Sequence, residues 1–372
     1  MKQKIAVLFG GKSGEHEVSL QSAASIVKNL DRSRYEILLI GIAQNGRWYL
    51  QDPPPPAEEV PDALSIREDG HRRVAVLPEG GLLCAGEALG IDIVFPVLHG
   101  PFGEDGTVQG LLEVANLPYV GAGVLGSALG MDKEMAKVLW KAHGLSVVPF
   151  VRIDKRDFGS EEAVGEVTVA GTSAFENLRE QCSRSFGYPL FVKPARVGSS
   201  VGISKVEDAE ALARALEEAL SFDTKALVEP AVTGQEVECS VRGNHHPVAS
   251  TPGEIIPHGG FYDYEAKYVD PDGAELVIPA RLDRSTTTAV QQRARQAYEA
   301  LGLEGMARVD FFIQEDGTIL LNELNTIPGF TRISMFPVLF AEDGLEYPML
   351  LDELIELARA RHSERSALRT SY

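Results

Sequence analysis

Cysteine is scarce in this chain, which has three cysteines in 372 residues. Cys84, Cys182 and Cys239 are an odd number, and their spacing matches no common set of metal ligands. Disulfide frameworks and structural zinc sites need paired or clustered cysteines, so the sequence argues against both. We therefore expect reduced thiols and a location in the cytoplasm.

Long apolar runs are missing as well. The apolar run near the start, Ile5 to Phe9, ends at Gly10-Gly11. It is too short for a signal sequence or for a helix that crosses a bilayer. We expect a soluble protein with no membrane partner.

Positive charge is also in short supply, because 35 lysines and arginines face 54 acidic residues and leave a net charge of −19. Nucleic-acid binding needs a basic surface, so a nucleic-acid partner is not expected. A small phosphorylated substrate held by a few lysines remains compatible with this charge. The familiar P-loop is missing, because Gly11-Lys12-Ser13 would need a glycine at position 6, where Ala6 stands.

The first part of the chain alternates strands and helices, which predicts a doubly wound α/β layer that binds ligands at the carboxyl ends of its strands. The predicted strands are 5–9, 35–42 and 92–98. Glu15 precedes a helix that starts near Glu17, and His99 opens the strand-end loop HGPFGEDG. Both are candidate site residues. Helix capping explains Glu15 equally well, and a single histidine is more often structural.

Lys133 lies in the first turn of a helix that we predict from Asp132 to His143. The residues expected to face the core are Met135, Val138, Leu139 and Ala142. The helix dipole disfavours a cation in a first turn, and a bound phosphate would remove that penalty. The alternative is an ordinary exposed lysine.

Lys193 lies in the segment YPLFVKPARVGSSVGISKV, within a run that is otherwise apolar. The loop 195–201 joins two predicted strands, whereas P-loops and Rossmann loops open helices. A lysine in such a run needs an anionic partner. The amides of Gly198 to Gly202 are suited to cover a phosphate tail, although a plain flexible hairpin is the alternative.

The segment from Arg308 to Asn325 predicts a β-hairpin turning at Asp316-Gly317. With those two residues as the loop, Asp310 lies opposite Glu323 and Arg308 opposite Asn325, all on one face. The other face then carries Val309, Phe311 and Ile313 against Leu320 and Leu324, with Asn322 as an exception. A bulge would shift this register.

Carboxylates directly opposite each other repel, so the face around Asp310 and Glu323 needs a compensating charge. Two carboxylates and the amide of Asn325 are oxygen ligands that suit Mg²⁺, which keeps further sites for water and phosphates. A solvated edge hairpin with scattered charges is the alternative.

Two further segments fit a nucleotide site. The strand ALVE ends at Glu229 and is followed by a short linker and Glu236, an arrangement able to support an adenine ring and its ribose. The stretch from Gly259 to Tyr268 is rich in tyrosine and polar residues and resembles a lid. The regions 50–90 and 152–182 are weakly patterned, and we interpret the second as a variable excursion.

Five motifs in one order resemble the D-alanine–D-alanine ligase family of the ATP-grasp superfamily. They are GGKSGEHEVS, VKPARVGSSVGISKV, FYDYEAKYVD, ARVDFF and NELNTIPGFT. The resemblance implies three α+β lobes within an α/β fold class: an N-terminal substrate-binding domain at 1–121, a central ATP-grasp lobe at 122–229, and a C-terminal lobe with the metal site and lid at 230–372. Ile327 stands where some relatives have Ser or Thr.

The resemblance also implies roles for individual residues. Those expected at the reaction centre are Glu15, His99, Ser199, Lys267, Tyr268, Arg308, Gly329 and Ser334. Those expected to contact ATP are Lys133, Lys193, Ser200, Val201, Gly202, Glu229, Pro230, Ala231, Val232 and Glu236. Those expected to hold two Mg²⁺ ions, or Mn²⁺ in their place, are Asp310, Glu323 and Asn325.

The implied reaction joins two D-alanines with ATP through a D-alanyl phosphate, for peptidoglycan synthesis, in a homodimer. One alternative is a ligase that makes D-alanyl-D-lactate, in which the tyrosine at the Tyr268 position is often missing. The other is a nucleotide-binding module without turnover, which predicts a damaged metal face.

Overall fold

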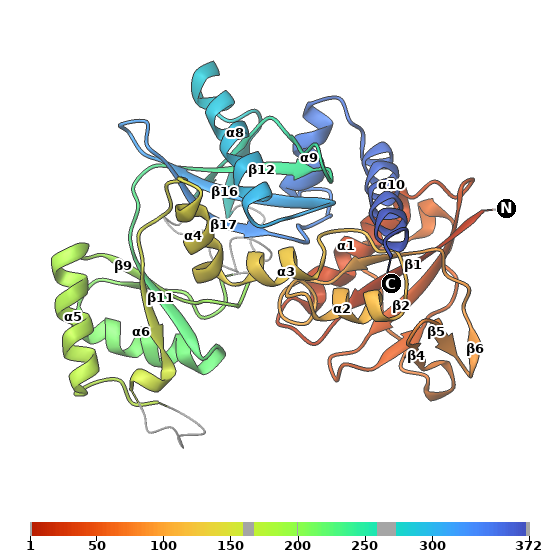
Figure 1. The fold of residues 1–372 in the computed structure, drawn as a ribbon, viewed down its shortest axis with the longest axis horizontal. Helices are drawn as coiled ribbons and strands as arrows, with labels where there is room; N and C mark the ends of the chain where they lie inside the picture. Colours follow the sequence, from red (N-terminus) through yellow and green to blue (C-terminus); the bar gives the residue numbers. More distant parts are fainter. Residues whose placement is uncertain (1, 159–166, 199, 259–272, 370–372) are drawn as a thin grey trace.

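The computed structural model describes residues 2–158, 167–198, 200–258 and 273–369. In this part of the chain the strands form four sheets, which follow one another along the molecule with helices packed around them (Figure 1). The predicted α/β fold class is confirmed. The predicted domain limits at 121 and 229 stay a prediction. The three larger sheets are built in turn from strands within residues 3–97, 151–230 and 235–325.

The N-terminal lobe has a four-stranded sheet in the order β3-β2-β1-β7. Its elements are β1 (Gln3–Gly10), α1 (His16–Asn29), β2 (Tyr35–Ile42), β3 (Trp48–Leu50), β7 (Ile93–Val97) and α2 (Thr107–Val114). The central strand β1 pairs in parallel with both β2 and β7. The carboxyl ends of β1 and β7 therefore lie side by side and lead to Glu15 and His99, as the alternating pattern predicts.

A small antiparallel sheet lies beside this lobe, within the weakly patterned region that gave no prediction. It consists of β4 (Val74–Leu77), β5 (Gly81–Cys84) and β6 (Glu87–Ala88). Its strands are only two to four residues long. Strands this short are below the window in which apolar alternation can be read.

The central lobe is an antiparallel sheet in the order β10-β9-β11-β8. Its elements are β8 (Val151–Asp154), α5 (Ser173–Ser185), β9 (Leu190–Pro194), β10 (Ser204–Val206), α6 (Ala209–Phe222) and β11 (Lys225–Pro230). β9 and β10 pair antiparallel, which confirms that the glycine-containing loop joins two strands. The interpretation of 152–182 as an excursion is wrong for its described residues, because β8 pairs with β11 and α5 buries Phe175, Leu178 and Cys182.

The third sheet has the order β15-β14-β12-β16-β17, with β13 beside β12. Its strands are β12 (Gln235–Arg242), β13 (Val248–Ala249), β14 (Gly253–Pro257), β15 (Ala274–Val277), β16 (Met306–Ile313) and β17 (Ile319–Asn325). The helices that accompany it are α3 (Val124–Met131), α4 (Lys133–Ala142) and α8 (Arg284–Ala300). One face packs on Trp140 and Tyr298, and the other faces the site.

The β16–β17 hairpin has the predicted pairing around Asp310 and Glu323, but a longer loop and a bulge produce it, instead of the two-residue loop that the prediction assumed. Its loop has three residues, since the Gln314 amide donates to the Thr318 carbonyl at 2.9 Å and Gly317 takes a left-handed φ of +83°. That loop alone would shift every pair by one residue. A bulge at Asn322 shifts the register back, so Asp310 lies opposite Glu323 and Arg308 opposite Asn325.

The two-residue loop is therefore a wrong prediction, and so is one core partner. Between the loop and the bulge, Phe311 pairs with Leu321, and Leu320 pairs with Phe312 instead of joining the apolar face. The bulge also explains the exception at Asn322, whose side chain turns to the polar side and lines the cavity there.

The C-terminal helices return to the N-terminal lobe. α9 (Met335–Glu342) and α10 (Tyr347–Ser366) contribute side chains to the same core as β1, β2 and β7. Phe330 is fully buried in this core, with its ring 5.9 Å from Phe95 and 5.4 Å from Phe336. Among the described helices, none is long and apolar enough to cross a membrane.

We expect Phe330→Ala to lower the free energy of unfolding by about 3–5 kcal/mol, because it removes a buried ring from the junction of two lobes. Chemical unfolding followed by tryptophan fluorescence measures this change. Leu125→Ala, at a side chain that is 67% exposed on α3, is the control and should change stability by less than about 0.5 kcal/mol. An equal effect of both variants would contradict the assignment of Phe330 to the shared core.

Candidate active site

The polar face of the third sheet carries two rows of side chains across three strands. Glu238, Asp310 and Glu323 lie opposite one another on β12, β16 and β17. Ser240, Arg308 and Asn325 form the next row. The hairpin predicted four of these six residues, and β12 adds the other two.

Arg308 provides charge compensation on this face. Its guanidinium donates to both carboxylate oxygens of Asp310, at 2.8 and 2.7 Å, and its Nε lies 3.0 Å from Glu238 Oε2. The Asn325 amide nitrogen donates to Asp310 at 3.0 Å. A protein cation therefore already offsets the repulsion that the sequence pattern implied, so the repulsion alone does not require a metal ion.

The donor set still fits a hard divalent cation. Asp310, Glu323 and Asn325 offer two carboxylates and an amide oxygen from adjacent strands. Within the described ranges, no three His, Cys, Asp or Glu side chains form a compact metal cluster. An ion held here would keep coordination positions for water or for phosphate, which is the usual behaviour of Mg²⁺.

A cavity of about 150 Å³ lies between this face and the central lobe. Its polar lining includes Lys193, Ser200, Glu229, Glu236, Asp310, Asn322 and Glu323. Pro230, the last residue of β11, and Val232, in the linker after it, also line the cavity. Ala231 between them donates its amide to the Pro189 carbonyl at 3.0 Å. The structure thus brings together residues that the sequence assigned to three separate segments.

Helix α4 presents two lysines to the interior. Its buried positions are Lys133, Ala136, Lys137 and Trp140, spaced at three and four residues as on one helical face. The predicted inward face is wrong for Met135 and Val138, which are 39% and 44% exposed, and for Ala142, which is also exposed. Leu139 packs against the core of the third sheet as predicted. The reading of Lys133 as an exposed lysine is also wrong. The apolar pattern misled because it treats lysine as a surface residue.

Lys133 connects α4 with β17 and with the glycine-containing loop. Its Nζ lies 3.4 Å from Glu323 Oε2 and donates to the Val197 carbonyl at 2.9 Å. Its backbone amide donates to the Ala195 carbonyl at 3.0 Å. One lysine thus places a positive charge between the Glu323 carboxylate and the start of the loop.

Lys193 and Lys137 share one carboxylate. Glu229 is 3% exposed, and its two oxygens lie 2.7 Å from Lys193 Nζ and 2.8 Å from Lys137 Nζ. Burial alone would raise the pKa of Glu229, but the two lysines lower it below its usual value. Lys193 also donates to Asn322 Oδ1 at 3.2 Å.

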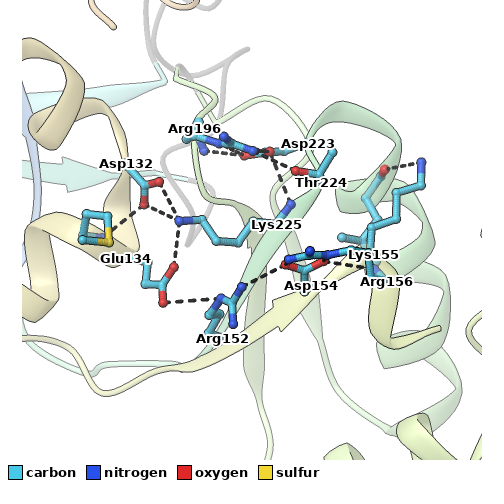
Figure 2. A network of polar contacts seen from close by, with 12 residues as sticks. Asp132, Glu134, Arg152, Asp154, Lys155, Arg156, Arg196, Asp223, Thr224 and Lys225 are labelled. Carbon is cyan, nitrogen blue, oxygen red and sulfur yellow. Dashed lines mark hydrogen bonds and ion pairs between the residues drawn. The ribbon is translucent and has the colours of Figure 1, made fainter. Parts of the chain in front are cut away.

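The start of β11 holds α4 in place, as Figure 2 shows. Lys225 Nζ lies 2.6 Å from Asp132 and 2.7 Å from Glu134, the residues on either side of Lys133. Asp132 also caps α4 by accepting from the Met135 amide. The position of Lys133 is therefore fixed from both sides.

Asp223, just before β11, holds the start of the glycine-containing loop. The Arg196 side chain forms an ion pair with Asp223, whose carboxylate also accepts from the Arg196 amide at 2.8 Å (Figure 2). Further along the loop, Gly202 has a left-handed φ of +70°, and a Cβ there would lie 2.9 Å from a Pro194 side-chain carbon. The Val201 amide donates to the Gly198 carbonyl at 3.2 Å.

Glu15 lies where the N-terminal lobe meets this loop. It occupies the N-cap position of α1 without a side-chain capping hydrogen bond, so capping does not explain its side chain. A Cβ on Gly198 would lie 2.9 Å from Glu15 Oε2, and one on Gly100 would lie 2.7 Å from it. Glycine at both positions allows this close approach.

Two neighbours of Glu15 are buried and held by backbone atoms. His99 Nδ1 lies 3.0 Å from the Ile327 carbonyl and its Nε2 lies 3.2 Å from Ser22 Oγ, and burial lowers its pKa. Glu104 accepts from the amides of Gly100 and Ile327, at 2.7 and 3.2 Å. Burial, together with the nearby charge of Glu15, raises the pKa of Glu104 to about 8.

Gly329 and Ser334 lie together in the loop after β17. A Cβ at Gly329 would lie 2.6 Å from Ser334 Oγ, so a larger residue would displace that hydroxyl. Ser334 Oγ accepts from the Thr331 amide at 3.0 Å and precedes α9. The structure therefore brings these two predicted residues together. Ser199, Lys267, Tyr268 and the predicted lid from Gly259 lie outside the described residues.

Five residues of the site were missed by sequence reasoning. They are Glu104, Lys137, Glu238, Ser240 and Asn322. Two signals were available: Glu238 alternates with Glu236 on a predicted strand, and Lys137 follows Lys133 by one helical turn. Glu104 and Asn322 had no comparable signal, because a loop fold and a bulge place them.

Comparison with known proteins matches both halves of the chain to one family, the family that the sequence motifs resemble. The family model described as the D-ala D-ala ligase N-terminus matches residues 4–122, and the model described as its C-terminus matches residues 139–356. A D-alanine–D-alanine ligase of Treponema denticola is 47% identical, with 98% of each chain covered. One of Oceanobacillus iheyensis is 44% identical, over 100% of this chain and 99% of the relative.

Solved structures agree with these matches. The D-alanine-D-alanine ligase of Coxiella burnetii has a TM-score of 0.81 at 37% identity, over 98% of this chain and 96% of that one. A D-Ala:D-Ser ligase of Enterococcus faecalis has the same TM-score and identity, over 96% of this chain and 100% of that one.

We expect Glu104→Gln to change how stability depends on pH. The folded pKa lies above the ordinary value of 4.5, so the folded protein holds this proton from about pH 5 to 8 while the unfolded chain loses it. The wild type should therefore lose stability as pH rises through this window, by at most about 1.4 kcal/mol per pH unit.

Glutamine cannot ionise, but its amide group has one oxygen and one NH₂. The NH₂ would face one of the two backbone amides, of Gly100 or Ile327, that donate to Glu104. Glu104→Gln should therefore be less stable than wild type at pH 5, by about 1 kcal/mol, and more stable above pH 8. Thermal unfolding of both proteins at several pH values tests this crossing. Parallel stability curves would show that Glu104 titrates normally.

Proposed function

The chain belongs to the D-alanine–D-alanine ligase family, and from this premise we propose that the cavity between the central and third sheets is its ATP site and that the reaction occurs at the adjoining polar face. The enzyme uses ATP to join two D-alanines into D-alanyl-D-alanine, a peptidoglycan precursor. The observation that supports the location is the convergence of Lys193 and the Asp310–Glu323 pair on one cavity, with Lys133 Nζ 3.4 Å from Glu323.

The first chemical task is to activate a carboxylate, which is a poor electrophile, by transferring the γ-phosphoryl group of ATP to it. Negative charge spreads over the transferred group, and Lys193 and Lys133 lie where they neutralise it. Two Mg²⁺ ions, or Mn²⁺, held by Asp310, Glu323 and Asn325 would add Lewis-acid neutralisation of the same charge. Glu229, Glu236 and the linker 230–232 would hold the adenine and ribose.

The second task is attack on the acyl phosphate by the amine of the second D-alanine. We assign the ammonium group of the first D-alanine to Glu15 and the carboxylate of the second to Ser334. Arg308 and the Gly329 amide would stabilise the oxyanion of the tetrahedral intermediate. His99 would help to hold the surrounding loops in place and would not contact substrate through its ring nitrogens, since protein atoms contact both of them.

Water would hydrolyse the acyl phosphate, so the reaction needs a cover over the site. We propose that the segment from Gly259 to Tyr268, with Lys267 beside the phosphates, and the loop of Ser199, Ser200, Val201 and Gly202 supply it. We further propose that the enzyme works as a homodimer in the cytoplasm, without nucleic-acid or membrane partners.

The alternatives differ in the second substrate or in turnover. Relatives that are 42–47% identical are D-alanine–D-alanine ligases, which does not favour D-lactate. A module without turnover predicts a damaged metal face, whereas Asp310, Glu323, Asn325 and Arg308 are all in place on adjacent strands.

Phosphate release from ATP, measured with D-alanine, L-alanine, D-serine or D-lactate, tests the proposed function. D-Alanine alone should support steady release with D-alanyl-D-alanine as the product. L-Alanine, D-serine or D-lactate, each added singly, should not support release. No D-alanine-dependent release from folded protein would contradict the proposal.

We expect Glu323→Gln to reduce turnover by about a hundredfold or more, because it removes one of the two carboxylates that would hold the Mg²⁺ ions and so weakens the neutralisation of the transferred phosphoryl group. The fold should be retained, since Glu323 is partly exposed and repulsion from Asp310 is relieved. Glu315→Gln, the same change at the exposed hairpin tip, is the matched control and should behave as wild type. Wild-type turnover in Glu323→Gln would refute the metal assignment.

A further inference from the structure

The buried cluster of Lys137, Glu229 and Lys193 contains two cations and one anion. Lys137 has no exposed surface, and the other two side chains are 3% and 6% exposed. A buried charge needs a partner, so the single carboxylate is shared between two ammonium groups. The cluster therefore carries one excess positive charge at the edge of the cavity.

The two lysines differ in what else they can reach. Lys193 lines the cavity together with Glu229, so a ligand there can contact it. Lys137, on α4, contacts Glu229 from the side away from the cavity and does not line the cavity. Its other polar contact is the Val148 carbonyl, at 3.4 Å. Lys137 can therefore influence a ligand only through another residue.

We propose that Lys137 is a positioning residue for nucleotide binding: it neutralises Glu229 from the core side and so leaves the charge of Lys193 for the phosphates. The proposal rests on the proposed function, because it takes the cavity to be the ATP site. Without Lys137, Glu229 would have Lys193 as its remaining cation. Phosphate binding by Lys193 would then leave a buried carboxylate poorly compensated.

This arrangement explains why a lysine is fully buried on α4, which the nucleotide contacts alone do not. An apolar residue of similar length would fill the space beside Trp140 and would avoid the desolvation that lowers the pKa of Lys137 to about 8. The ion pair with Glu229, at 2.8 Å, offsets that cost, and the benefit appears at Lys193.

The test compares Lys137→Met, Glu229→Gln and the double variant with the wild type, using ADP binding by calorimetry and the KM values for ATP and D-alanine. In Lys137→Met the Kd for ADP should rise about tenfold or more, the size expected for a contact with a charged group. The KM for ATP should rise in parallel, while the KM for D-alanine should stay within about twofold, the usual scatter between distant sites.

The double variant separates positioning from packing. If Lys137 acts through Glu229, adding Lys137→Met to Glu229→Gln should change the Kd for ADP by less than about twofold, since no carboxylate remains to be neutralised. This comparison also serves if Lys137→Met alone does not fold. Lys141→Met, at an exposed residue one turn further along α4 near its end, is the matched control and should bind ADP as the wild type does.

An unchanged Kd in folded Lys137→Met would overturn the proposal. So would an equal loss of ADP affinity in the presence and absence of the Glu229 carboxylate, because it would show that Lys137 only packs. Failure of the proposed function is a separate result: the wild type and Lys141→Met would then neither bind ADP nor release phosphate with D-alanine.

Discussion

The compensation of buried charge is the constraint on which the site depends. Carboxylates on β11, β16 and β17 lie in an interior where an isolated charge is costly, and each is paired with a cation, from the same strand for Asp310 and from other elements for Glu229 and Glu323. Arg308 serves Asp310, Lys133 approaches Glu323, and Lys137 and Lys193 serve Glu229. Because these pairs join helix α4 to two different sheets, the same interactions that make the acidic residues tolerable also set the geometry of the cavity.

The polar face was predictable from sequence because it follows from strand parity. Alternation on β16 and β17 places Asp310 with Arg308 and Glu323 with Asn325 whatever the details of the turn. The loop and the bulge were not predictable, since they depend on a left-handed Gly317 and on a local shift at Asn322 that no periodicity records. The assumed two-residue loop and the missed bulge each shift the register by one residue, in opposite directions. The predicted pairs around Asp310 were therefore correct, and the predicted position of Leu320 was wrong.

The inward face of α4 shows where sequence patterns stop being informative. A helix is oriented from its apolar residues on the assumption that lysine faces water, and that assumption selects Met135 and Val138. The helix turns instead because Lys133 and Lys137 find Glu323 and Glu229 on strands far along the chain. Such partners are a property of the tertiary fold, so the residues missed by sequence were partners of residues that it had already identified.

The cations of this site differ in how permanently they are engaged. Lys137 faces the core side of Glu229, and Lys225 lies between the two acids that flank Lys133, so both fix protein groups. Lys193 and Lys133 lie near the cavity and contact protein oxygens there. On the proposed assignment, a phosphate would compete with oxygens already in place, and its affinity would reflect the difference between two sets of contacts. Fixed cations behind the site would then reduce what the exchangeable ones must relinquish, so that charges which never touch the ligand would still affect how tightly it is held.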